Sequence, residues 1–144
     1  MRSPAFKKAN DSVQGCAAYR LLHAGSMKHI LIADDNIGMA ALVARALPDY
    51  HVTTAHNGIE ALVLAKTLPR CDLMITDYMM PAMNGTQVAN RLRSERPSVK
   101  TLLMTGHNDV VGLEPETYGT DDFLAKPFRP SVLRAKVQAL IGRA

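Results

Sequence analysis

The sequence predicts an α/β fold in which a doubly wound parallel sheet carries helices on both faces. Three observations support this. Apolar runs and amphipathic segments alternate five times after Met27, and the segments between them are short enough for right-handed crossovers. The 144 residues are 47% hydrophobic and 21% charged, which suits one globular domain. No apolar stretch approaches the roughly 18–20 residues of a membrane span, so we expect no membrane association.

The first two strands and the helix between them are read from short-range patterns. The apolar run His29–Ala33 predicts a buried strand. Asn36 is a capping residue type, and the helix that it opens is expected to reach residue 47, where Pro48 ends it. The run His51–Ala55 is more polar and is expected nearer a sheet edge. The predicted apolar stripe of the helix consists of Met39, Ala40, Leu42, Val43, Ala46 and Leu47.

The middle of the chain continues the alternation. A second helix is expected over residues 57–68, and a third strand over residues 72–77. Either Asn84 or Thr86 can cap the helix that follows, which is expected to end near residue 95.

The last third holds two strands and one well-defined helix. Residues 99–104 predict the fourth strand, and residues 123–125 begin the fifth. The final helix is expected over Pro130–Ile141, because proline suits a first turn where no amide donor is needed. The fourth helix is expected to be short or irregular, since Gly112, Pro115 and Gly119 interrupt residues 105–121.

The domain is expected to span residues 27–144, preceded by a disordered arm or an upstream start at residues 1–26. The alternative for the arm is a short docking helix built on Val13, Ala17, Leu21 and Leu22. The arm holds four basic residues and one acidic residue, whereas residues 27–144 hold 13 and 12, so the folded part offers no electrostatic case for nucleic-acid binding. Two cysteines and an interrupted apolar stretch favour a reducing cytoplasm and no secretory signal.

Polar side chains gather at the carboxyl ends of the predicted strands, where ligands bind in such sheets. Asp34 and Asp35 follow the first strand, and Asp77 ends the third. Three carboxylates at one edge repel one another, and a hard divalent cation with oxygen ligands relieves that repulsion. Mg²⁺ fits because it takes few carboxylates and keeps positions open for water and phosphate.

Two further strand ends supply a hydroxyl and a positive charge. Thr105 can donate a hydrogen bond, and Lys126 offers a point charge for an anion. A carboxylate beside Mg²⁺ with these groups nearby is arranged for phosphoryl transfer onto that carboxylate. Asp77 is the best candidate nucleophile because it ends the predicted central strand, while metal binding suits Asp34 and Asp35 better.

These residues carry a family resemblance. Ala33-Asp34-Asp35, Asp77 with Pro81 and Asn84-Gly85, Met104-Thr105-Gly106 and Lys126-Pro127-Phe128 occur in the order and at the strand ends that are typical of the receiver domain of two-component response regulators. About residues 27–142 of the chain resemble this family. The resemblance implies a flavodoxin-like fold with strand order 2-1-3-4-5.

The resemblance also implies a role for each site residue. Asp77 would accept the phosphoryl group, and Thr105 and Lys126 would contact it. Thr105 and Phe123 would form the switch pair, and the Lys126–Pro127 bond would be cis. The implied Mg²⁺ ligands are Asp35, Asp77, the Met79 carbonyl and, through a bound water, Asp34.

The function that follows is a stand-alone receiver, phosphorylated by a sensor histidine kinase or a phosphotransfer protein, that alters its binding to an unidentified downstream protein. The chain ends three residues after Ile141, so no output domain is expected here. Beyond Mg²⁺-dependent self-phosphorylation and self-dephosphorylation, no enzymatic activity is expected. The irregular fourth helix weakens a common dimer surface, which favours a monomer.

Several alternatives remain at this stage. A phosphohydrolase of the haloacid dehalogenase type would need an aspartate at position 79, where this chain has Met79, and a scaffold would not need the acidic cluster. Phe123 can be an ordinary core residue, and His107 an exposed loop residue rather than one that tunes dephosphorylation. The group Arg91, Arg93, Arg96 and Lys100 is interpreted as a solvated surface, with a partner-binding patch as the alternative.

Overall fold

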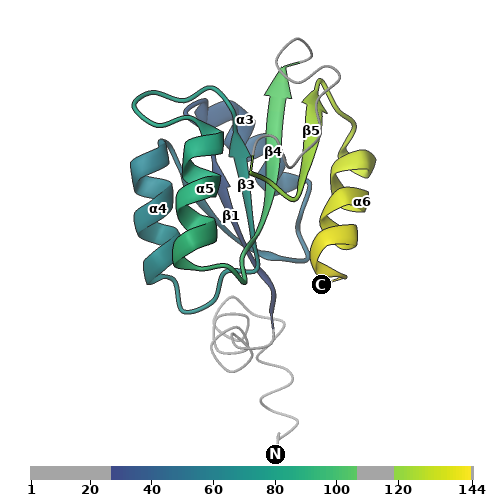
Figure 1. The fold of residues 1–144 in the computed structure, drawn as a ribbon. Coiled ribbons are helices and arrows are strands. Elements are labelled where there is room, and N and C mark those ends of the chain that lie inside the picture. The colour runs from purple at the N-terminus through teal and green to yellow at the C-terminus, as the bar shows by residue number, and fades with distance from the viewer. Residues whose placement is uncertain (1–26, 107–118, 144) are drawn as a thin grey trace, which may run out of the picture.

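The computed structural model of the protein describes residues 27–106 and 119–143. Within these residues, five parallel strands form one sheet in the order β2-β1-β3-β4-β5, and their carboxyl ends all point to the same edge (Figure 1). The order places β3 at the centre and confirms the predicted fold class. The strands are β1 (His29–Ala33), β2 (His51–Ala55), β3 (Leu73–Asp77), β4 (Lys100–Gly106) and β5 (Asp122–Lys126).

Helices cover both faces of the sheet (Figure 1). On one face, α3 (Ile37–Arg45) and α6 (Pro130–Ile141) pack on Ile30 and Ile32 through residues that include Val43 and Leu133. On the other, α4 (Gly58–Thr67) and α5 (Gly85–Glu95) pack on Leu31 and Ala33. Alternate residues of β1 therefore face opposite cores, which explains why the whole strand is buried and apolar.

Asparagine side chains cap three of these helices. Asn36 accepts the Met39 amide, and Asn57 accepts the Glu60 amide. Asn84, not Thr86, caps α5: its side chain accepts the Gln87 amide at 2.9 Å, while Gln87 reaches back to the Asn84 amide. This capping box fixes the start of α5 directly after the loop that follows β3.

The structure corrects some details of the predicted elements. The helix α3 ends at Arg45 rather than at residue 47, because Ala46 and Leu47 form its closing turn. Leu42 is 51% exposed and so does not belong to the buried stripe. The strand β4 extends two residues beyond its predicted end, since Thr105 and Gly106 pair with β5.

The basic group of residues 91–100 is not uniformly solvated. Arg91, Arg93 and Lys100 are exposed. Arg96 is half-buried, and its Nη1 donates to the carbonyl oxygens of Ala65 and Leu68 at the end of α4. The surface interpretation was therefore wrong for Arg96, which satisfies two carbonyls that the helix leaves unpaired.

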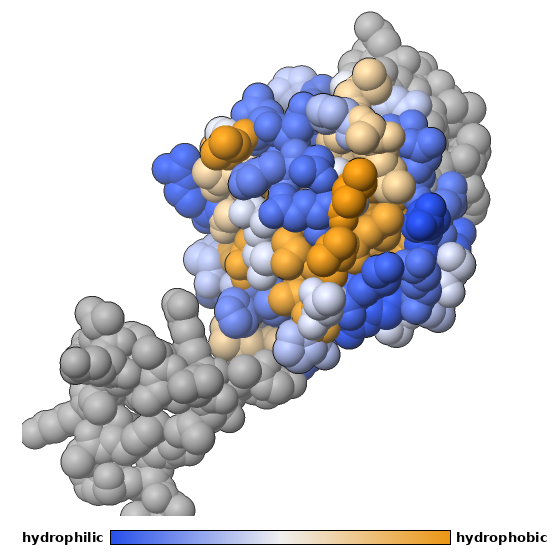
Figure 2. Space-filling view, turned by 90° about the vertical axis from the view of Figure 1, so that its left-hand side faces the viewer, coloured by the Kyte–Doolittle hydropathy of each residue, from blue (hydrophilic) through white to orange (hydrophobic). Residues whose placement is uncertain are grey.

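The outer face of α4 exposes two large apolar side chains. Ile59 and Val63, one turn apart, are each more than half exposed, and hydrophobic side chains gather over this helix (Figure 2). None of the helices in the described part of the chain is long and apolar enough to cross a membrane. The predictions for the arm, for His107 and for the fourth helix fall on residues 1–26 and 107–118, outside the described residues.

Candidate functional site

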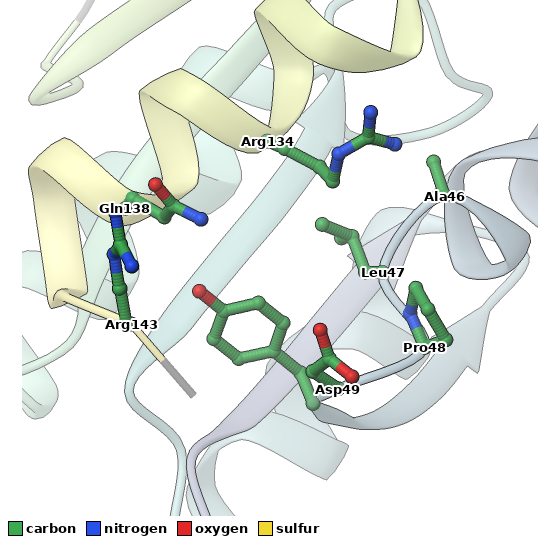
Figure 3. Close-up of a pocket in the computed structure, with 8 residues that line it drawn as sticks. Ala46, Leu47, Pro48, Asp49, Arg134, Gln138 and Arg143 are labelled. Carbon is green, nitrogen blue, oxygen red and sulfur yellow. The ribbon is translucent and has the colours of Figure 1, made fainter.

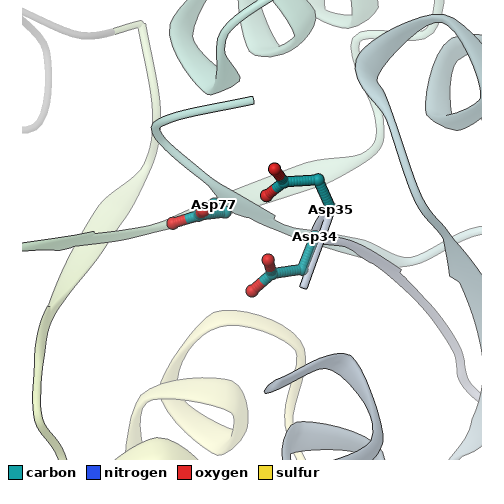
Figure 4. Close-up of side chains that lie close together, drawn as sticks. All are labelled: Asp34, Asp35 and Asp77. Carbon is teal, nitrogen blue, oxygen red and sulfur yellow. The ribbon is translucent and has the colours of Figure 1, made fainter. Parts of the chain in front are cut away.

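The three predicted carboxylates meet at the carboxyl edge of the sheet. Asp34 follows β1, Asp35 is its neighbour, and Asp77 is the last residue of the central strand β3. One oxygen from each lies within 4.8 Å of the others (Figure 4). Asp34 is completely buried and Asp77 is 9% exposed, whereas Asp35 is exposed. The strand order thus assembles the acidic cluster that the sequence predicted.

Only one of the two carboxylate oxygens of Asp34 accepts a hydrogen bond among the described residues. The Asn36 amide donates to its Oδ1 at 2.9 Å, whereas its buried Oδ2 has no hydrogen-bond partner among the described residues. Burial raises the pKa of Asp34 above its ordinary value, and the nearby Asp77 and Asp35 charges act in the same direction, against the Asn36 amide and Lys126. A buried carboxylate oxygen without a partner is costly, so this position favours a bound cation.

Lys126 contributes a positive charge to the site. Its Nζ donates to Asp77 Oδ1 at 2.8 Å and lies 3.9 Å from Asp34 Oδ2. The residue ends β5, and the peptide bond to Pro127 is cis, as predicted. One lysine facing three carboxylates leaves the cluster with net negative charge, which again suits a divalent cation.

Thr105 and Phe123 occupy neighbouring strands on the same face of the sheet. Thr105 is 1% exposed and pairs in register with Ala125, two residues beyond Phe123. Thr105 directly follows Met104, and Met104 pairs in register with Asp77 on β3. Phe123 is half-buried, so it is neither a full core residue nor a free surface residue.

The loop between β3 and α5 borders the cluster. The Tyr78 amide donates to the Met104 carbonyl, and the Gly85 amide donates to the Tyr78 carbonyl, each at 2.8 Å. A Cβ at position 85 would lie 2.3 Å from the Asp77 carbonyl oxygen, so only glycine fits there. The Met79 side chain is 64% exposed.

The residues present fit Mg²⁺. The donor set consists of oxygen atoms, two of the three carboxylates are buried, and one buried oxygen lacks a partner. Asp35 remains exposed, which leaves room for water and a phosphoryl group on the solvent side. The arrangement can therefore bind a divalent cation against Asp77 and bring an anion between that cation and Lys126.

One pocket lies away from the acidic cluster. This pocket of about 440 Å³ lies between the turn from α3 to β2 and α6, where Asp49, Arg134 and Gln138 line it (Figure 3). None of the predicted site residues lines this pocket. The acidic cluster therefore lies outside this pocket.

Sequence reasoning missed one contributor to the site and one unusual backbone conformation in the loop beside it. Asn36 was predicted only as a helix cap, yet its backbone amide also holds the Asp34 carboxylate. Ala82, in the loop after Asp77, has a φ of 69°, a conformation unusual for a residue with a Cβ. Neither signal is visible in the sequence, because one is a backbone contact and the other a backbone angle.

Comparison with known proteins gives a consistent picture. The response regulator receiver domain family matches residues 30–138. The chain is 35% identical over 123 residues to the alkaline phosphatase synthesis transcriptional regulatory protein PhoP of Bacillus subtilis, which covers 81% of this chain and 50% of that protein. It is 38% identical over 121 residues to the probable transcriptional regulator ycf27 of Cyanidium caldarium, covering 80% and 47%. The chain thus spans about half the length of these relatives.

Solved structures agree with this similarity. The chemotaxis response regulator CheY4 of Vibrio cholerae superposes with a TM-score of 0.70 at 30% identity, covering 79% of this chain and 98% of that one. A CheY-like receiver domain protein from Methanospirillum hungatei JF-1 gives a TM-score of 0.71 at 26% identity, covering 78% and 92%. Both likenesses cover nearly all of the matched chains.

Proposed function

The chain belongs to the response regulator receiver domain family, and from this premise we propose that Asp77 accepts a phosphoryl group from a histidine kinase or a phosphotransfer protein. The single observation that carries the proposal is the buried Oδ2 of Asp34, which lies beside Asp77 and 3.9 Å from Lys126 Nζ and accepts no hydrogen bond among the described residues. An ordinary structural carboxylate would have its oxygens satisfied. Here one lysine faces three carboxylates, so the cluster has net negative charge that favours binding of a cation. The bound cation and Lys126 together would then favour binding of an anion.

In this proposal Asp35, Asp77 and the Met79 carbonyl would hold Mg²⁺, and Asp34 would act on the cation through a water. When bound, the cation neutralises negative charge that develops on the phosphoryl oxygens. The oxygen-only donor set and the net charge of the cluster support the choice of Mg²⁺ over a transition metal.

The transfer itself uses the residues of this chain. A carboxylate oxygen of Asp77 attacks the phosphorus of a phosphohistidine, an O–P bond forms, and the N–P bond breaks with its electron pair left on the imidazole. Lys126, which donates to Asp77 at 2.8 Å, is positioned to contact the transferred group. Thr105, buried on the adjacent strand, would then donate to a phosphoryl oxygen.

The expected output is a changed protein-binding face. Thr105 and Phe123 lie on one face of adjacent strands, so a movement of one side chain alters the space open to the other. Phosphorylation would thus shift a two-state equilibrium. Beyond self-phosphorylation and self-dephosphorylation, we propose no enzymatic activity. That the protein acts as a stand-alone monomer in the cytoplasm stays a prediction.

The direct test is chemical phosphorylation. The chain is incubated with acetyl phosphate and Mg²⁺, and the covalent product is followed by intact mass and by mobility on a phosphate-affinity gel. We expect one phosphoryl group on the wild type and none on Asp77→Asn. Asp49→Asn is the matched control, since Asp49 is an exposed aspartate away from the acidic edge. Equal incorporation into the wild type and Asp77→Asn would refute Asp77 as the acceptor.

A further inference from the structure

The pocket between α6 and the turn after α3 is lined by charged groups that the proposed phosphoryl transfer does not use. Its volume of about 440 Å³ falls within the roughly 300–1,000 Å³ of small-molecule sites. On one side, Arg134 and Gln138 belong to α6 and Arg143 follows that helix, whereas Asp49 belongs to the turn on the other side (Figure 3). The two sides of the pocket therefore carry opposite charge.

Hydrogen bonds hold the backbone on the α6 side of the pocket. The Tyr50 hydroxyl donates to the Gly142 carbonyl at 2.9 Å, and the Gly142 amide donates to the Gln138 carbonyl at 2.8 Å. Lys28 Nζ donates to the Arg143 carbonyl, also at 2.9 Å. These contacts join the end of α6 to the segments that begin β1 and β2. The backbone that carries the two arginines is therefore in place before any ligand binds.

The charged side chains of the pocket are not used by the fold. Among the described residues, neither the Arg134 nor the Arg143 guanidinium forms a hydrogen bond or an ion pair, and Asp49 forms no ion pair with them. Isolated exposed arginines are commonly only solvated, but these two line one concave site that the buried Leu47 also lines. A guanidinium presents paired donors to carboxylate or phosphate oxygens, whereas Asp49 attracts an ammonium group.

We propose that this pocket binds a small zwitterion, which carries a phosphate monoester or a carboxylate at one end and an ammonium group at the other. The anionic end binds Arg134 and Arg143, and the ammonium end lies toward Asp49. The carbon atoms between the two ends contact Leu47 and Pro48, which line the same pocket. The inference goes beyond the proposed function, because the acidic cluster contributes no residue to this pocket.

The test is a titration of the full chain, labelled with ¹⁵N and free of Mg²⁺, followed by the shifts of its backbone amides in NMR spectra. The probes are O-phosphoethanolamine, 4-aminobutanoate, and ethyl phosphate, which has the anionic end without the ammonium group. We expect the amides of Tyr50 and Gln138 to shift with a zwitterion, and the one with the lower Kd identifies the preferred anionic group. Ethyl phosphate should bind about threefold more weakly than O-phosphoethanolamine, because it lacks the ion pair with Asp49.

Variants of each side of the pocket test the two halves of the ligand. Arg134→Gln and Arg143→Gln should each raise the Kd for O-phosphoethanolamine about tenfold, because each removes a charged donor. Asp49→Asn should abolish the preference over ethyl phosphate. Arg91→Gln is the matched control, since Arg91 is exposed on α5 and does not line the pocket, and its Kd should equal that of the wild type. The same spectra show whether each variant is folded.

The remaining outcomes contradict the proposal. If neither zwitterion shifts these amides, or if the shifts gather around Asp77 and Lys126 instead, the pocket is not the binding site. Equal affinity for O-phosphoethanolamine and ethyl phosphate would exclude a zwitterion as the ligand. A loss of affinity in Arg91→Gln equal to that in Arg134→Gln would show that only overall charge matters. Phosphorylation of Asp77 is measured separately, so the failure of one proposal is distinguishable from the failure of the other.

Discussion

The aspartates at the amino ends of the strands (the amino edge of the sheet) differ in their hydrogen bonds from those at the carboxyl ends (the carboxyl edge). At the amino edge, Asp72 Oδ2 accepts the His29 amide and Arg70 Nε, each at 2.8 Å. Asp121 Oδ2 likewise accepts from the amide and the hydroxyl of Thr101. At the carboxyl edge, Asp34 Oδ2 is buried without a hydrogen bond among the described residues, and Lys126 is placed between Asp34 and Asp77.

This difference separates carboxylates that stabilise the fold from carboxylates that are placed for the proposed chemistry. The amino-edge aspartates tie neighbouring strands together, and their charges are satisfied inside the protein. At the carboxyl edge, the buried Asp34 Oδ2 accepts no hydrogen bond among the described residues and has Lys126 Nζ 3.9 Å away, an arrangement that lowers stability. Removing a carboxylate should therefore have opposite effects on stability at the two edges.

The largest effect is expected at the amino edge. Asp72→Ala removes the acceptor of the His29 amide, a group at a buried position, and of Arg70. We expect the free energy of unfolding to fall by about 2 kcal/mol, because a buried donor loses its charged partner. Urea unfolding at pH 7.5 without metal measures it. Mg²⁺ binding should be unaffected, and a loss of Mg²⁺ binding would contradict the division between the two edges.

A smaller effect of opposite sign is expected at the carboxyl edge. Asp34→Asn keeps an oxygen that can accept the Asn36 amide but removes a buried charge that Asp77 and Asp35 repel. We expect a gain of about 1 kcal/mol in the metal-free protein. Saturating Mg²⁺ should stabilise the wild type more than the variant. A variant that is less stable than the wild type without metal would show that Asp34 is a structural residue after all.

The smallest expected effect concerns His29, whose ring stacks on His51 at 4.6 Å and whose Nε2 lies 2.7 Å from Thr53 Oγ1. Burial, followed by the His51 charge, lowers the pKa of His29 below 6.5. The unfolded chain then binds more protons than the folded chain as the pH falls below 6.5, so stability is full above that pH and declines beneath it. Urea midpoints between pH 7.5 and 5.5 measure the decline.

His29→Gln provides the comparison for that measurement. The variant lacks the titrating ring at position 29, so its stability should depend less on pH across the same range. Identical pH profiles for the two proteins would show that His29 does not titrate differently on folding.

Much of the fold could be predicted because the local signals agree with the global arrangement. Local signals predicted the strand at His29–Ala33 and the starts of three helices, after the capping asparagines at positions 36, 57 and 84. The structure has a strand and helices at these places, so tertiary contacts did not change the type of these elements. Element ends were less predictable. The last two residues of β4 belong to the strand because β5 pairs with them, and that partner is distant in sequence.

The proximity of the strand-end residues could be predicted, whereas the inner geometry of the cluster could not. The rule that parallel strands present their carboxyl ends at one edge brought Asp34, Asp77 and Lys126 together correctly. The unpartnered oxygen of Asp34 depends on how deeply the chain buries it, and the turn at Ala82 depends on packing against α4. Both arise from tertiary contacts that no sequence spacing encodes.

The position of Lys126 on the final strand has a consequence for biosynthesis. The ribosome releases the acidic residues of β1 and β3 well before the lysine, so a nascent chain has the negative charges of the site without their counterion. The edge strand β5 joins only β4 in the sheet, and its addition completes the charge pairing. The charge pairing between Lys126 and Asp77 therefore forms only after β5 has joined the sheet.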